Sequence, residues 1–274
     1  MKTAMSGDDA LVSAVARARD GDAAALEAVV RALQNDVFRL ALRMTAHVQD
    51  AEDVTQEVLI KVITRIESFR GESSIRTWAY RIAVRHMLDR QRSRVEAMPL
   101  TFEAFGADLL DGLAADADPD PLAIEEVKRG CTLAMLMCLD RDHRIAYILS
   151  DVFDMPPADA AVLCGISHEA LRQRLSRARR MLEAFTRSYC GLIDPAAACS
   201  CDRRVARAAE LGRLRRDSPI LATWPAETLD RAREEMESLH DAASLMRSHP
   251  RYRCPQAVLA RIRRSMDWPE AGRD

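Results

Sequence analysis

The sequence predicts an all-α protein: two helical domains, an acidic linker between them and a helical C-terminal extension. The 274 residues are rich in helix-forming Ala, Leu, Arg and Glu. Only 10 are Gly and 11 Pro, which excludes collagen-like and low-complexity chains. Apolar residues recur at three- and four-residue steps, and no segment shows the alternation of a half-buried strand.

The first domain, residues 10–95, is predicted to contain three long helices. Asp22 is a suitable N-cap for a helix over 23–47, whose apolar residues follow the helical period. A second helix is expected over 50–68. A third begins near Ser74.

An acidic segment follows the first domain. Between residues 100 and 126 there are eight acidic residues and no basic one. The segment includes Asp-Pro-Asp-Pro and shows no helical period. We therefore expect residues 96–124 to be a linker.

The second domain, residues 125–187, is predicted to end in a helix-turn-helix. Its helices are expected over 122–138, 141–153, 157–163 and 168–189. Gly165 supplies the turn, because glycine adopts positive φ without strain. Ser167 caps the second helix of the motif. In such motifs the second helix contacts base edges in the major groove through its N-terminal residues.

Charge is segregated along the chain although the net charge is only −2. Residues 70–94 carry seven Arg against two acids, and residues 168–187 carry six Arg against two. Basic side chains neutralise phosphates in nucleic-acid complexes. Solvated helix faces and a tether are one explanation. Two basic segments that flank an acidic stretch are harder to explain in that way, because the acidic tether could shield a polyanion-binding surface or mimic a polyanion.

The second helix of the first domain carries a polar face opposite its apolar stripe. Asp53, Gln56, Glu57 and Ile60 share this face at helical spacing. Such a face suits docking onto a basic protein surface. Acids in the first turn also favour the helix dipole, so a purely structural role is the alternative.

The third helix and the loop before it combine arginines with aromatic rings. The segment reads FRGESSIRTWAYRIA over residues 69–83. Single-stranded DNA binding needs cations for phosphates and flat rings for unstacked bases, and this segment supplies both. The alternative for Trp78 is that it packs in the core and does not contact DNA.

These three motifs, in this order, resemble the sigma-70 family of RNA polymerase sigma factors, and in particular its small extracytoplasmic function (ECF) group. The family's clamp-binding helix in region 2 is similar to DAEDVTQEV, residues 50–58. Its segment that melts and recognises the −10 promoter element resembles residues 69–83. Its region 4, which binds the −35 element, resembles residues 139–182.

The resemblance implies a protein that directs the polymerase to promoters and performs no catalysis itself. The implied partners are the core polymerase, through its β′ clamp, and promoter DNA; whether an anti-sigma factor also binds stays open. The implied core-binding residues are Asp53, Gln56, Glu57 and Ile60. The implied −10 contacts are Arg70, Ser74, Arg76, Trp78, Arg81 and Arg85, the last standing where the family usually has Asn. The implied −35 contacts are Glu169, Arg172, Gln173, Arg174, Ser176 and Arg177.

The extension over 188–274 lies beyond the resemblance, and a regulatory role for it is a hypothesis. Cys190, Cys199 and Cys201 could supply three ligands to a zinc ion. The fourth would be His240, His249 or Cys254. The alternatives are a redox-sensing thiol pair and thiols without a ligand. No other cofactor is expected.

Two other function classes stay open at this stage. A stand-alone helix-turn-helix regulator with a metal- or redox-sensing extension would bind duplex DNA without a polymerase. A thiol or metal enzyme is less favoured, because no His/Glu pair for acid–base chemistry lies near the cysteines. With no membrane-length apolar run and no signal-peptide core, the sequence predicts no membrane association and a cytoplasmic location.

Overall fold

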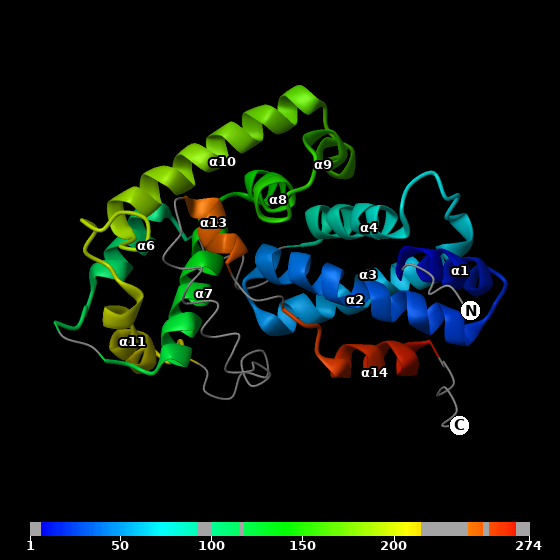
Figure 1. Ribbon diagram of the computed structural model, residues 1–274, viewed down its shortest axis with the longest axis horizontal. Coiled ribbons are helices and arrows are strands. Elements are labelled where there is room, and N and C mark those ends of the chain that lie inside the picture. The colour runs from blue at the N-terminus through cyan, green and yellow to red at the C-terminus, as the bar shows by residue number, and fades with distance from the viewer. Residues whose placement is uncertain (1–6, 92–99, 116–117, 215–240, 249–251, 267–274) are drawn as a thin grey trace, which may run out of the picture. The chain divides into compact units, whose positions relative to one another are not determined.

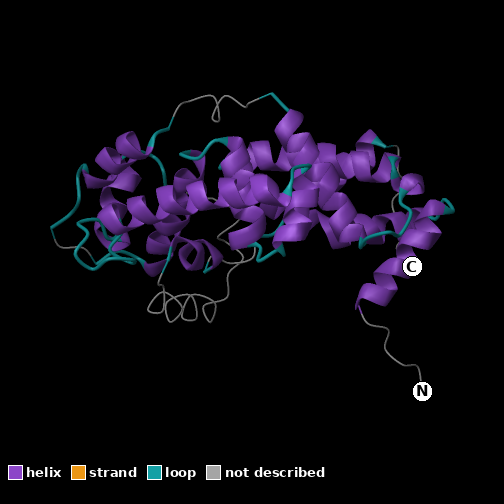
Figure 2. Cartoon of the chain, turned by 90° about the horizontal axis from the view of Figure 1, so that it is seen from above, coloured by secondary structure: helices purple, strands orange, loops and turns teal. Residues whose placement is uncertain are grey.

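The computed structural model describes residues 7–91, 100–115, 118–214, 241–248 and 252–266, and every regular element in these ranges is helical (Figure 2). The all-α class predicted from the sequence is confirmed. Within these ranges the one β-type pairing is an isolated bridge between Cys190 and Cys199. None of the described helices is both long and apolar enough to span a membrane.

The chain divides into two compact units. Unit 1 combines residues 1–91 with residues 252–274, and unit 2 comprises residues 92–251. The sequence predicts one continuous extension over 188–274. The structure divides that extension, because its last part packs with the N-terminal helices.

Unit 1 is a helical bundle (Figure 1). Its elements are α1 (Gly7–Arg19), α2 (Ala23–Thr45), α3 (Val48–Thr64), the 3-10 turn η1 (Ile66–Ser68), α4 (Ile75–Asp89) and α14 (Gln256–Ser265). The core centres on α2 and α3, where Val29, Leu40, Val58 and Val62 are completely buried. Burial of such side chains is the main favourable contribution to folding.

Side-chain caps fix where the helices of unit 1 begin, as the sequence predicts. The Asp22 carboxylate accepts a 3.0 Å hydrogen bond from the amide of Ala25. The Ser74 hydroxyl accepts one of 3.0 Å from the amide of Thr77. Each cap satisfies an amide that has no partner within its helix. The second helix differs from its predicted range of 50–68: it begins at Val48 and ends at Thr64, where η1 follows.

Unit 2 contains the remaining described helices. They are α6 (Phe102–Leu110), α7 (Pro121–Met137), α8 (Arg141–Tyr147), the π-helical turn η2 (Ile148–Val152), α9 (Pro157–Cys164), α10 (His168–Tyr189), α11 (Cys201–Glu210) and α13 (Ala242–Arg247). Arg144 on α8 is buried and donates 2.9 Å hydrogen bonds to the carbonyl oxygens of Leu136 and Leu139. These bonds satisfy acceptors at the end of α7 and hold α8 against it.

The prediction of an irregular linker over 96–124 is wrong for residues 102–110, which form α6. Phe102 and Phe105 pack against Phe185 of α10, with ring centroids 5.2 and 5.3 Å apart. This long-range aromatic cluster compensates for the weak local helical pattern. The segment is thus part of the unit 2 core.

Acidic residues of the same segment bind arginines from beyond α10. Asp108 accepts hydrogen bonds of 2.9 Å from Arg204 and 2.8 Å from Arg213, and Asp111 accepts one of 2.6 Å from Arg207. Hydrogen bonding from Arg213, aided by the charge of Arg204, holds the pKa of Asp108 below its ordinary value against the opposing effect of burial. The acids are therefore neutralised within unit 2.

The helices predicted in the extension are only partly seen. The first, expected over 202–216, is α11 and ends at Glu210. The second, expected over 225–247, lies outside the described residues up to position 240, and α13 covers its last six residues.

Candidate nucleic-acid interface

A helix-turn-helix is formed by α9 and α10, as the sequence predicts. Gly165 ends α9 with φ of +66°, the left-handed conformation that glycine tolerates. The Ser167 hydroxyl then accepts a 3.1 Å hydrogen bond from the amide of Ala170 and caps α10. Leu171, Leu175 and Leu182 bury the inner stripe of α10. The turn and the cap therefore leave the opposite side of α10 free for a ligand.

The exposed side of α10 carries the predicted recognition residues. Glu169 lies 3.5 Å from the guanidinium of Arg172 and accepts a 3.4 Å hydrogen bond from Gln173. The surface there forms a depression of about 440 Å³, lined by these residues together with Ser176, Arg177 and Arg180. These donors and acceptors match the groups that recognise base edges and phosphates in the major groove.

Two arginines of α10 are used within unit 2. Arg174, predicted as a −35 contact, lies 3.0 Å from the Asp142 carboxylate on α8. Arg179 donates two hydrogen bonds, of 2.7 and 2.6 Å, to Asp151. Both residues hold α10 against its neighbours, and Arg174 is half-buried, whereas Arg172 and Arg177 are exposed.

The loop before α4 displays the second basic group. Gly71 has φ of +74°, and the space around it is open. Trp78 is half-buried and packs against Phe69, with ring centroids 5.5 Å apart. One side of the Trp78 ring therefore packs within unit 1, which agrees with the alternative prediction that Trp78 is a core residue. Arg70 before the loop is exposed.

The arginines of α4 divide between fold and surface. Arg81 and Arg85 are exposed, and Arg85 lies 3.6 Å from the Asp89 carboxylate on the same helix. Arg76, in contrast, pairs with Asp36 of α2 and donates a 3.3 Å hydrogen bond to the carbonyl oxygen of Ala32. The structure therefore gives Arg76 a role in joining α4 to α2, which the prediction of a −10 contact does not include.

The predicted core-binding residues share one side of α3. Gln56 and Ile60 are half-buried and Glu57 is exposed. Glu57 lies 2.9 Å from Nε2 of His86, whose Nδ1 is 2.6 Å from the Lys61 ammonium. Burial, reinforced by the charge of Lys61, lowers the pKa of His86. The neutral ring therefore orients two charged side chains of this surface.

The cysteines at the start of the extension come near one another and near Cys131 of α7. Burial raises the pKa of Cys131 on α7, and Cys201, Cys190 and Cys199 raise it further, so the four thiols are neighbours. Burial also raises the pKa of Cys199 to about 11. In the described residues, no three His, Cys, Asp or Glu side chains are arranged to hold a metal ion. Zinc binding by the trio Cys190, Cys199 and Cys201 stays a prediction.

None of the predicted fourth ligands lies among the described residues of unit 2. Cys254 belongs to unit 1, whereas the trio belongs to unit 2. His240 and His249 lie outside the described residues. A redox pair stays the alternative prediction; burial raises the pKa of Cys199, which favours the less nucleophilic thiol form.

Comparison with known proteins assigns both units to one family. Sigma-70 region 2 matches residues 29–96, and Sigma-70 region 4 matches residues 129–182. The ECF RNA polymerase sigma factor SigC of Mycobacterium tuberculosis (strain CDC 1551 / Oshkosh) is 34% identical over 183 residues, which are 66% of this chain and 95% of SigC. The chain belongs to the ECF group of sigma-70 family sigma factors. The resemblance inferred from the motifs is confirmed.

Two further comparisons cover a smaller share of this sigma factor than SigC does. The ECF RNA polymerase sigma factor SigE of Mycolicibacterium smegmatis is 30% identical over 155 residues, 54% of this chain and 56% of SigE. The solved structure of the sigma factor RpoE in complex with the anti-sigma factor NepR, from Bartonella quintana, aligns with a TM-score of 0.40 and 22% identity, covering 57% of this chain and 92% of that chain.

The matched regions enclose every predicted protein- and DNA-contact residue of the sigma factor. Region 2 spans most of α2 and all of α3 and α4, and region 4 spans α7 from residue 129 to residue 182 in α10. The thiols over 190–201 and helix α14 are among the features that lie outside both matches. The sequence motifs missed Cys131 as a neighbour of those thiols, and they missed Arg261 of α14 beside Asp53.

Proposed function

We propose that this ECF sigma factor binds core RNA polymerase through the α3 face of Asp53, Gln56, Glu57 and Ile60. The residues of this face are exposed or half-buried, so a partner can reach them. The ring of His86 holds Glu57 and Lys61 in place beside it. The polymerase supplies nucleotidyl transfer, and this chain supplies promoter specificity in the cytoplasm, where the polymerase works.

The two basic surfaces would contact the promoter. In the proposal, Arg70, Ser74, Trp78, Arg81 and Arg85 bind the −10 element, and Glu169, Arg172, Gln173, Ser176 and Arg177 bind the −35 element. One observation supports the −35 assignment. The N-terminal part of α10 is exposed, and it follows a turn that Gly165 forms and Ser167 caps. Simultaneous contact at both elements would raise the overall affinity, because the second contact is intramolecular.

Run-off transcription with core polymerase from the host bacterium tests this function. Adding the chain should yield a discrete promoter-dependent transcript. Glu57→Arg should reduce core binding, whereas Gln173→Ala should leave core binding intact and reduce transcription from promoters with a −35 element. Arg187→Ala, an exposed change near the far end of α10, is the matched control. Sequence-specific DNA binding by the free chain, with no effect on start-site selection, would instead favour the stand-alone regulator.

A further inference from the structure

The segment over 252–266 is anchored on α2 before its helix begins. Tyr252 is buried, and the guanidinium carbon of Arg43 lies 5.0 Å from the centre of its ring. This is within the range of a cation–π contact. The backbone amide of Cys254 then donates a 2.8 Å hydrogen bond to the side-chain oxygen of Asn35. Two contacts with α2 thus set the position from which α14 starts.

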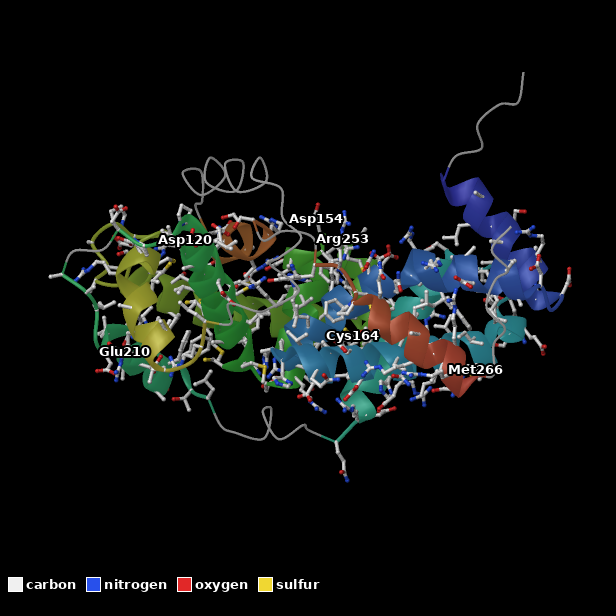
Figure 3. All side chains as sticks on the ribbon, turned by 90° about the horizontal axis from the view of Figure 1, so that it is seen from below. Asp120, Asp154, Cys164, Glu210, Arg253 and Met266 are labelled. Carbon is white, nitrogen blue, oxygen red and sulfur yellow. The ribbon has the colours of Figure 1, made fainter. Side chains whose placement is uncertain are left out.

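Helix α14 buries an apolar stripe against unit 1. Val258, Leu259 and Ile262 on this stripe are buried, whereas Arg264 is exposed. Figure 3 shows α14 in red along the blue helices, between the labelled residues Arg253 and Met266. The stripe makes α14 an amphipathic helix with a defined docking face.

Two arginines of α14 meet carboxylates on α2 and α3. Arg261 places one guanidinium nitrogen 3.2 Å from Glu52 and another 3.3 Å from Asp53. Arg263 pairs with Glu27 of α2. The unit 1 surface that α14 covers therefore presents carboxylates to the arginines of the helix.

The contact with α14 affects the pKa values of Glu27 and Glu52. At Glu27, burial acts to raise the pKa, but hydrogen bonds from Arg31 and Arg263 outweigh it and hold the pKa below its ordinary value. Burial raises the pKa of Glu52, and Arg261 opposes that rise. The arginines of α14 therefore stabilise the charged form of both carboxylates.

Asp53 takes part in two contacts, one observed and one proposed. It pairs with Arg261 of α14, and it belongs to the α3 face of the proposed function. We infer that the α2–α3 surface is a docking site for an arginine-bearing amphipathic helix, that α14 occupies it in the free protein, and that α14 and core polymerase exclude each other there. This inference rests on the proposed function, from which it takes the core-binding face.

The contact is suited to displacement. α14 has ten residues, and isolated helices of that length are marginal in water. The Asp53 carboxylate is 45% exposed in its pair with Arg261, and exposed ion pairs contribute little. A larger partner surface that uses the same carboxylate can therefore replace α14. If α14 is docked in about nine molecules of ten, the apparent affinity for core falls about tenfold.

Two measurements on the full-length protein test the inference. The first is the Kd for host core polymerase, and the second is the alkylation rate of Cys254, whose buried side chain reports whether the segment is docked. Arg261→Glu opposes Glu52 and Asp53, and Ile262→Asp places a charge in the buried stripe. Arg264→Glu makes the same charge change as Arg261→Glu on the exposed side of the helix and is the control. Peptide mass spectrometry separates Cys254 from the other cysteines.

The expected result is about tenfold tighter core binding and faster Cys254 alkylation in Arg261→Glu and Ile262→Asp, with Arg264→Glu like wild type. Adding core to the wild-type protein should also accelerate Cys254 alkylation, because mutual exclusion is reciprocal. Faster alkylation without tighter binding overturns the exclusion, and unchanged alkylation in both variants overturns the docking. If no version binds core, the proposed function fails, and the alkylation rates still report on docking by itself.

Discussion

Arg204 of α11 donates a 2.9 Å hydrogen bond to Asp108 of α6 across 96 residues of sequence. Arg204 is buried, whereas Asp108 is only partly covered. The bond joins the acidic segment that follows region 2 to the extension that follows region 4. The first part of the extension is therefore structurally part of unit 2.

We expect Arg204→Met to loosen α6 and α11. The change removes a buried, charge-assisted hydrogen bond, which corresponds to a loss of about 2 kcal/mol. Arg207→Met on the same helix is the matched control. Its 2.6 Å bond to Asp111 lies at the surface, where an ion pair contributes little to stability. Hydrogen exchange of the α6 and α11 amides measures the effect of each substitution. Equal effects of Arg204→Met and Arg207→Met would contradict the greater contribution expected of the buried bond.

Region 2 should lose stability in mildly acidic solution. The pKa of His86 is lowered from 6.5 by burial and by Lys61, so the unfolded chain binds a proton more readily than the folded one. The contribution is fully present above pH 6.5 and is lost as the pH falls towards the lowered pKa. His86→Gln, which stays uncharged, should flatten the dependence of Tm on pH between 6.5 and 5. A parallel decline in both proteins would exclude His86 as its cause.

Lys128→Met should strongly destabilise unit 2. Lys128 is 1% exposed and lies 3.2 Å from the Glu125 carboxylate, which is also buried. Removing one partner leaves an uncompensated buried charge, which costs about 3–5 kcal/mol. The double change Lys128→Met, Glu125→Leu should recover most of that loss. Thermal unfolding followed by circular dichroism gives both values, and a double variant no more stable than the single one would refute the explanation.

Arg172 and Arg177 should differ in their effect on promoter binding. Arg172 lies in the first turns of α10, where a bidentate contact with guanine contributes about 1–3 kcal/mol of discrimination. Arg172→Ala should therefore relax preference at one position of the −35 element. Arg177→Ala should weaken binding to all sequences and reduce the salt slope by about 1, as expected for a phosphate contact. Holoenzyme binding to a randomised −35 library at several salt concentrations separates the two effects.

Local signals in the sequence predicted most of the helices. Asp22, Ser74 and Ser167 cap α2, α4 and α10 where the sequence places the helix starts, and Gly165 ends α9. Each of these features depends on a side chain and an amide three residues away, or on one backbone angle. Such interactions are visible in a short window of sequence, and they place the turn of the helix-turn-helix correctly.

Features built from distant residues were not predictable in the same way. Helix α6 depends on Phe185, more than 70 residues along the chain from Phe105. The role of Arg76 depends on Asp36 of α2, and the neutralisation of Asp108 depends on α11. Helix α14 does have a short apolar pattern, but its partner Asp53 is encoded near the other end of the chain. A sequence motif indicates which interactions a side chain can make, but it does not identify the distant residue with which the side chain interacts.

The arrangement of unit 1 has a consequence for biosynthesis. Its helices α1 to α4 leave the ribosome early, whereas α14 is translated only after all of unit 2. At translation rates of 5–20 residues per second, this delay is roughly 8 to 30 seconds. During that interval the nascent chain exposes Glu52 and Asp53 without the helix that later covers them. Every newly made molecule thus passes through a state in which these two carboxylates lack their α14 partner.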